Sequence, residues 1–139
     1  MLFLLDASAV LNDFSFEFKK THSYFTTNPI LQEFRDIRSR NLADNAIKKG
    51  TLKIADPSTL LLKKAASIAN SLEQRMLSEA DLSILALAME LKERDERFIL
   101  ITDDHSLQFI CRELKMPFQA IIRGKIRKWK KPKKQGKKG

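Results

Sequence analysis

Short, continuous runs of apolar residues recur along the chain, and two of them end abruptly in acidic residues. Residues 2–5 are followed by Asp6, and residues 98–101 are followed by Thr102, Asp103 and Asp104. Uninterrupted apolar runs of this length are typical of strands in a parallel sheet, which are buried on both faces. We therefore predict strands over residues 2–6 and 98–102, each with carboxylates at its carboxyl end.

The rest of the chain alternates between helix and strand patterns. Three further strands are expected, over residues 22–27, 52–55 and 118–122. Residues 13–22 have phenylalanine at alternate positions, which fits either a loop or a short strand. Helices are expected over six segments: residues 7–11, 28–37, 42–49, 58–74, 78–94 and 104–115. We expect Asn28 to cap the second of these helices, with Pro29 in its first turn.

The alternating order predicts an α/β fold of three layers, with a central parallel sheet and helices on both faces. In such sheets, ligands bind beyond the carboxyl ends of the strands. Helices that follow parallel strands begin at that same edge. Asp81 lies in the first turn of one such helix, and Glu33 lies early in another. We therefore expect both near the strand-end acids Asp6, Asp103 and Asp104.

Carboxylates gathered at one edge repel one another unless a cation lies between them. Because the expected ligands are all oxygens, the sequence predicts one or two hard divalent ions, Mg²⁺ or Mn²⁺, bound by Asp6, Asp81, Asp103 and Asp104. Glu33 is expected to hold a second ion or to position a water molecule beside the ion. Ser8 and Thr102 are expected to orient the carboxylates as neighbouring hydroxyls.

Each of these residues also has an ordinary structural interpretation. Asp6 could cap the helix that follows it, and Thr102 could also serve as a cap. Ser8 and the Asp103–Asp104 pair fit helix caps or turns, and Asp81 fits the acidic position of a capping box that starts at Ser78. Glu33 alone would be a solvated surface residue. His22 and His105 are expected to be structural or exposed rather than catalytic.

The 139 residues suit one domain, whose charge is unevenly distributed. Residues 123–139 contain 10 of the 26 Lys and Arg residues and none of the 17 acids, so the rest of the chain has a net charge of −1. We expect a domain over residues 1–122 and a flexible basic tail that binds nucleic acid. The residues expected to bind it, as RNA if the resemblance described below holds, are Arg123, Lys125, Arg127, Lys128, Trp129, Lys130 and Lys131. The alternative is a solubilising tail, with Trp129 packed on the domain.

Several classes of protein are excluded. The single Cys111 rules out a disulfide framework or a cysteine-based zinc site within the chain, and no apolar run reaches the ~18 residues that span a bilayer. We therefore expect a cytoplasmic location, no zinc and no membrane contact. The chain contains no P-loop, glycine-rich dinucleotide motif or G-x-S-x-G.

Four segments together resemble the PIN-domain nucleases: residues 4–9, 29–33, 78–88 and 101–104. The resemblance covers residues 1 to about 122. It implies that Asp6, Glu33, Asp81 and Asp103 or Asp104 hold Mg²⁺ or Mn²⁺ at the strand ends. It also implies hydrolysis of RNA to products with a 5′ phosphate and a 3′ hydroxyl.

Within that family, residues 103–108 are similar to the Nob-type endonucleases, which cut precursor small-subunit rRNA at its 3′ end. Archaeal and eukaryotic members usually carry a zinc ribbon, and here a basic tail stands in its place. The implied partners are precursor small-subunit rRNA or the pre-ribosomal particle, and a second copy of the chain. The alternatives are a VapC-like toxin, whose partner would be an antitoxin, and a catalytically inactive RNA-binding PIN module.

Two other folds that place aspartate at strand ends fit less well. A phosphotransfer receiver would have two acids at the end of the first strand, where Asp6 is followed by Ala7 and Ser8. A phosphatase of the haloacid dehalogenase type would have Asp-x-Asp there, but position 8 is serine.

Overall fold

A computed structural model of the chain describes residues 1–122 and, for the backbone, residues 125–127. Its sheet has the strand order β3-β2-β1-β4-β5-β6. The strands are β1 (Leu2–Leu5), β2 (Ser23–Thr26), β3 (Leu52–Ile54), β4 (Ile99–Ile101), β5 (Phe118–Ile122) and β6 (Lys125–Arg127). Strands β1 to β5 are parallel, which confirms the predicted central sheet.

Strand β6 was not anticipated from the sequence. It lies within the segment expected to be a flexible basic tail, and pairs antiparallel with β5 so that Ile121 is opposite Ile126. The proposed boundary between domain and tail at residue 122 remains a prediction, and residues 128–139 lie outside the described part of the chain.

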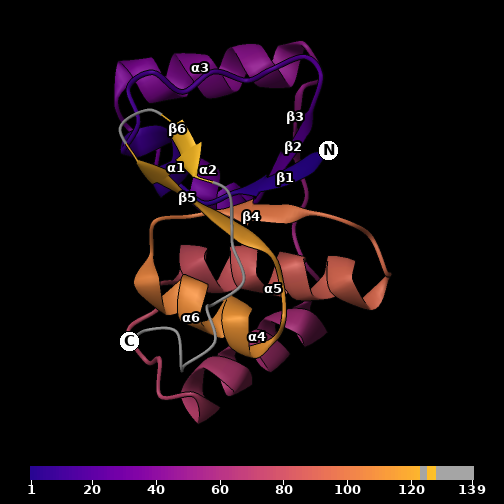
Figure 1. Cartoon of the computed structure of the whole chain (residues 1–139). Helices are drawn as coiled ribbons and strands as arrows, with labels where there is room; N and C mark the ends of the chain where they lie inside the picture. Colours follow the sequence, from indigo (N-terminus) through magenta and orange to yellow (C-terminus); the bar gives the residue numbers. More distant parts are fainter. Residues whose placement is uncertain (123–124, 128–139) are drawn as a thin grey trace, which may run out of the picture.

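The helices cover both faces of the sheet. Figure 1 shows α3 on one side of the sheet and α4, α5 and α6 on the other, as the three-layer prediction requires. The helices are α1 (Ser8–Leu11), α2 (Asn28–Leu31), α3 (Ile37–Lys48), α4 (Thr59–Ser71), α5 (Glu79–Glu93) and α6 (His105–Glu113).

The predicted helix over residues 28–37 was wrong in extent. The chain leaves helical geometry after Leu31, and a new helix begins at Ile37 because the Asp36 side chain accepts a 2.9 Å hydrogen bond from the amide of Ser39. Asn28 is not the cap of α2; the Thr27 side chain accepts the bond from the amide of Ile30 instead. Glu33 therefore lies in the turn between α2 and α3.

The core is formed by the central strands and by α5, whose residues from Ser83 to Met89 are all buried. Strand residues Leu4, Leu100 and Ile101 are completely inaccessible to solvent. Helix α5 is buried around most of its circumference because it lies between the sheet and α4. Within the described residues, no helix has the length and apolar character needed to cross a membrane.

The order of the strands determines where a ligand site can form. The connections from β1 to β2 and β3 run toward one edge of the sheet, whereas those from β3 to β4 and β5 run toward the other. The direction therefore reverses between β1 and β4. In open α/β sheets, the crevice for ligands lies at the carboxyl ends of the two strands at such a reversal.

Candidate active site

Asp6 lies at the carboxyl end of β1, beside the end of β4. In the parallel register, Leu5 is opposite Ile101, and the Asp6 amide donates a 3.1 Å hydrogen bond to the Ile101 carbonyl. Two segments distant in sequence thus end side by side. This is the reversal point of the sheet, where the apolar runs predicted that carboxylates would meet.

The carboxylate of Asp6 is buried, with only 4% of the residue exposed. Its Oδ2 atom accepts hydrogen bonds from the Thr102 hydroxyl at 2.7 Å and from the Ser8 hydroxyl at 3.2 Å. The pKa of Asp6 is raised from its ordinary 3.8 to about 6. Burial is the largest cause; the Thr102 hydrogen bond lowers the pKa and the charge of Asp81 raises it. Asp6 is therefore a carboxylate whose negative charge is poorly solvated.

The same two hydroxyls also hold the loop that follows β4. The amide of Asp103 donates to the Ser8 hydroxyl at 2.9 Å, and the amide of Asp104 donates to the Thr102 hydroxyl at 3.0 Å. Each hydroxyl oxygen accepts from an amide, and its single proton is directed to Asp6. Ser8 makes no cap bond to α1, which begins after Ala7 without a side-chain cap, so the alternative role of Ser8 as a cap was wrong.

The structure separates the roles of the two adjacent aspartates after β4. The Asp103 carboxylate accepts a 2.8 Å bond from the Ile121 amide in β5 and a 3.4 Å bond from the Asn12 side chain. Both oxygens of Asp103 are thus used to hold neighbouring segments. Asp104 caps α6 through a 2.9 Å bond from the Leu107 amide, and its charge raises the pKa of Asp81.

Asp81 is the shared neighbour of the other acids. It forms the predicted capping box, in which its carboxylate accepts from the Ser78 amide at 3.0 Å and its own amide donates to the Ser78 hydroxyl at 3.1 Å. The pKa of Asp81 is raised first by burial and then by Asp104. Its charge in turn raises the pKa of Asp6 and of Glu33.

Glu33 is a solvent-exposed member of this group of acids. Burial raises its pKa first, the charge of Asp81 raises it further, and Arg35 lowers it. Asp6, Glu33 and Asp104 are therefore each within electrostatic reach of Asp81. We call Asp6, Glu33, Asp81 and Asp104 the acidic cluster.

The acidic cluster fits a divalent cation in its donor atoms and charge. Its donors are carboxylate oxygens, the ligands that Mg²⁺ and Mn²⁺ prefer. No Lys or Arg of the described chain is among the groups that shift the pKa of Asp6 or Asp81. Across residues 1–122, however, no three acids, histidines or cysteines lie close enough together to hold one ion directly, so the ligand set stays a prediction.

Buried hydroxyls that the sequence analysis did not single out connect the elements carrying the acids. Thr27, before α2, and Ser83 in α5 share a 2.6 Å hydrogen bond, and the Thr26 hydroxyl donates to the Leu5 carbonyl at 2.8 Å. The side chain of Gln108 donates to the Thr102 carbonyl at 2.8 Å. Thr26 and Thr27 were detectable by the rule that identified Asp6, because they end a predicted strand. Gln108 carried no such signal.

The predicted RNA-binding residues are less well described. Arg123, Lys128, Trp129, Lys130 and Lys131 lie outside the described residues. Lys125 and Arg127 are the first and last residues of β6, where Arg127 is opposite Ala120. Because Lys125 is opposite Ile122 and the amide of Ile121 donates to Asp103, β6 begins near the edge of the sheet that carries the acids.

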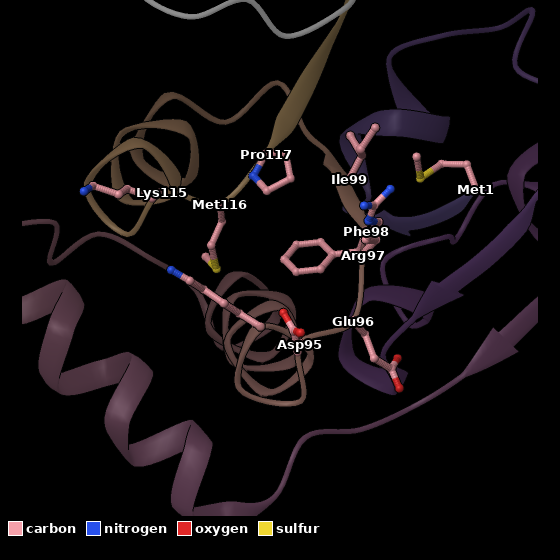
Figure 2. Close-up of a pocket in the computed structure, with 10 residues that line it drawn as sticks. Met1, Asp95, Glu96, Arg97, Phe98, Ile99, Lys115, Met116 and Pro117 are labelled. Atoms are coloured by element: carbon pink, nitrogen blue, oxygen red, sulfur yellow. The ribbon is translucent and has the colours of Figure 1, made fainter.

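A cavity of about 360 Å³ lies at the opposite edge of the sheet. Figure 2 shows the Phe98 ring and the Met116 side chain pointing into it, close to the start of β4. The length of β4 separates this cavity from Asp104. The carboxylates at the carboxyl ends of β1 and β4, rather than this cavity, identify the candidate active site.

Comparison with known proteins agrees with this geometry. Residues 3–91 match the family described as the PIN domain of ribonuclease. The chain is 30% identical to Endoribonuclease Nob1 of Methanothermobacter thermautotrophicus over 125 residues, which are 89% of this chain and 71% of that protein. It is 37% identical to Endoribonuclease Nob1 of Pyrococcus abyssi over 110 residues, covering 76% and 64% of the two chains.

A third relative has a different name. Ribonuclease VapC3 of Aeropyrum pernix is 37% identical over 86 residues, which are 61% of this chain and 62% of that protein. The chain thus spans less than two thirds of the length of two of these three relatives. The matched family segment includes Asp6, Glu33 and Asp81 and the strands β1 to β3 apart from Leu2, whereas Asp104 and strands β4 to β6 lie beyond it. The chain belongs to the PIN-domain family of ribonucleases.

Proposed function

We propose that this chain is a divalent-metal-dependent endoribonuclease that matures the 3′ end of small-subunit rRNA. The observation that carries the catalytic part is the acidic cluster around Asp81. A buried carboxylate, Asp6, lies at the sheet reversal point, and no described cation contributes to its pKa or to that of Asp81. Such an arrangement is unfavourable by itself and becomes favourable with a divalent ion bound.

In this proposal, Asp6, Asp81 and Asp104 hold the ion, and Glu33 holds a second ion or positions the attacking water. When bound, the ion would lower the pKa of that water and neutralise the negative charge that develops on the phosphodiester. Because four like charges repel without an ion, the carboxylates are expected to move closer together when it binds.

The remaining residues orient the carboxylates. Ser8 and Thr102 fix Oδ2 of Asp6 through their hydroxyl protons, which leaves that carboxylate one orientation. Asp103 holds β5 against the loop that carries Asp104.

The basic segment that starts with β6 supplies the positive field that draws RNA toward an edge otherwise lined by acids.

Asp6→Asn tests the catalytic proposal, because asparagine keeps the size of the side chain and removes its charge. We expect RNA cleavage with Mn²⁺ to fall by about 100-fold or more, with the fold retained. Asp13→Asn is the matched control, since Asp13 is equally buried at 4% exposure and its carboxylate accepts hydrogen bonds from the amide and hydroxyl of Ser15. Undiminished cleavage by the Asp6 variant would contradict the proposal.

The rRNA assignment is supported by the two Nob1 relatives, which align with 89% and 76% of this chain. The second candidate, a toxin ribonuclease controlled by an antitoxin, is favoured by the similarity to VapC3. Purified protein and Mn²⁺ should be incubated in parallel with precursor small-subunit rRNA, mRNA and tRNA. Cleavage confined to the 3′ boundary of the rRNA supports maturation, and cleavage of tRNA or mRNA supports the toxin.

A further inference from the structure

Phe14 is an aromatic residue that the fold leaves in solvent. Of the alternating phenylalanines 14, 16 and 18, Phe16 is buried at 5% exposure, and its ring meets that of Phe18 at 5.0 Å. Phe18 in turn contacts Tyr24 at 5.0 Å. Phe14, by contrast, is 83% exposed. A large apolar side chain held in water is informative when its position is also fixed.

The position of Phe14 is fixed by an arginine. The guanidinium of Arg38 lies over the Phe14 ring, with its central carbon 4.7 Å from the ring centre. One face of the ring is therefore occupied by a cation, and the high exposure of Phe14 leaves the other face open to solvent. Cation–π contact with Arg is a common way to hold an aromatic ring flat against a surface.

Arg38 is held in place by a hydrogen bond, and a nearby acid offsets its positive charge only in part. Its Nη2 atom donates to the Val10 carbonyl at 2.8 Å, whereas its Nη1 atom is buried and makes no hydrogen bond within the described structure. Its charge helps to lower the pKa of Asp36, but no ion pair with a carboxylate is found for Arg38 among residues 1–122. An anion near the ring would therefore meet a positive charge that Asp36 offsets only in part.

The pair is held by segments that also carry or contact the acids at the strand ends. Val10, which holds Arg38, is one helical turn beyond Asp6. Asn12, two residues before Phe14, donates to Asp103 in the loop after β4. On the other side, Arg38 lies in the first turn of α3, which follows the turn that carries Glu33.

We propose that Phe14, backed by Arg38, is a stacking platform for one unpaired base of single-stranded RNA beside the acidic cluster. The proposal rests on the ribonuclease function proposed above and identifies its substrate as unpaired at this position. A flat ring with one open face accepts any base, and Arg38 attracts the adjoining phosphate. A dimer contact would use the apolar surface of Phe14 alone, without need of aromatic character or of a cation.

The test is binding of a short single-stranded RNA to the full chain in EDTA, where no cleavage occurs. Phe14→Ala and Phe14→Leu should each weaken binding by about 10-fold, whereas Phe14→Trp should bind as the parent does. Met76→Ala is the matched control, because Met76 is 93% exposed in the loop before α5. Equal affinity of the leucine and tryptophan variants would overturn stacking.

An abasic scan of the RNA isolates the stacked base. At one position, removing the base should weaken binding to the parent protein about 10-fold and leave binding to Phe14→Ala unchanged. Sedimentation of the same proteins identifies the competing dimer contact. A change in the oligomeric state of Phe14→Ala with unchanged RNA affinity would overturn the platform.

Asp6→Asn separates this proposal from the proposed function. If Asp6→Asn abolishes cleavage and the Phe14 variants bind RNA as the parent does, the platform fails and the ribonuclease function stands. If the parent protein cuts no RNA but binding still depends on the ring of Phe14, the proposed function fails and the platform stands.

Discussion

The hydroxyl of Thr102 donates a 2.7 Å hydrogen bond to Oδ2 of Asp6, across 96 positions of sequence. The bond is buried, because Thr102 is inaccessible to solvent and Asp6 is only 4% exposed. It joins the ends of β1 and β4 at the point where the sheet reverses direction. The orientation of the central carboxylate therefore depends on a residue from the neighbouring strand.

Thr102→Val should disturb that carboxylate without changing the shape of the side chain. The hydrogen bond from Thr102 lowers the pKa of Asp6, so its loss should raise that pKa further. We expect the acid limb of the pH–cleavage profile to move to higher pH and stability to fall by about 1–2 kcal/mol. Thr102→Ser, which keeps the hydroxyl, should restore both. A profile unchanged in Thr102→Val would contradict this role.

The stability of the metal-free protein should fall as pH rises from about 4 to above 6. Folding raises the pKa of Asp6 from 3.8 to about 6, so the folded state holds a proton that the unfolded state has released in this range. The loss in the free energy of unfolding is about 3 kcal/mol. Denaturant unfolding at several pH values measures it. Asp6→Asn should remove most of this slope, and a slope equal to that of the parent would contradict the assignment.

Substitutions of the neighbouring Asp103 and Asp104 should have different effects. Asp104→Asn keeps a cap for α6, since asparagine caps helices as well as aspartate does, but it removes a charge from the acidic cluster. We expect cleavage to fall by about 100-fold with little change in melting temperature. Asp103→Ala should instead lower stability by about 1–3 kcal/mol, because the buried amide of Ile121 loses its acceptor. The reverse pattern would assign the ligand to Asp103.

Glu73→Gly should stabilise the fold at a position remote from the site. Glu73 has a φ of +61° at the end of α4, a conformation in which glycine avoids the steric penalty of a side chain. We expect an increase of about 0.5–1 kcal/mol, or about 2 °C in the melting temperature. Glu73→Ala retains the Cβ atom and is the control. Equal effects of the two variants would show that φ is not the cause.

The strands and the acids at their ends could be predicted from the sequence, because both depend on local pattern. The apolar run before Asp6 indicated a strand buried on both faces, and the spacing of Ser78 and Asp81 predicted the capping box that the structure shows. The parallel order then placed Asp6 and Asp104 at one edge. These inferences needed only periodicity and the topology rules for α/β sheets.

Other features depended on partners that a sequence does not reveal. The choice between Asp103 and Asp104 rests on the amide of Ile121, which reaches Asp103 only after β5 has paired with β4. By its position in the sequence, Ser8 could equally have capped α1. In the structure its hydroxyl instead accepts a hydrogen bond from the amide of Asp103. The helical pattern of apolar residues continues from Ile30 to Ile37, so it did not reveal the break after Leu31. Asp36 caps a new helix within that pattern.

Direct titration of the metal-free protein with Mn²⁺, followed by calorimetry or electron paramagnetic resonance, tests the central claim that the acidic cluster holds a divalent ion. The account predicts saturable binding by the parent protein and by Asp13→Asn. It predicts that Asp6→Asn and Asp81→Asn each weaken binding by about 10-fold or more. Absence of binding by the parent, or equal binding by all four proteins, would contradict it.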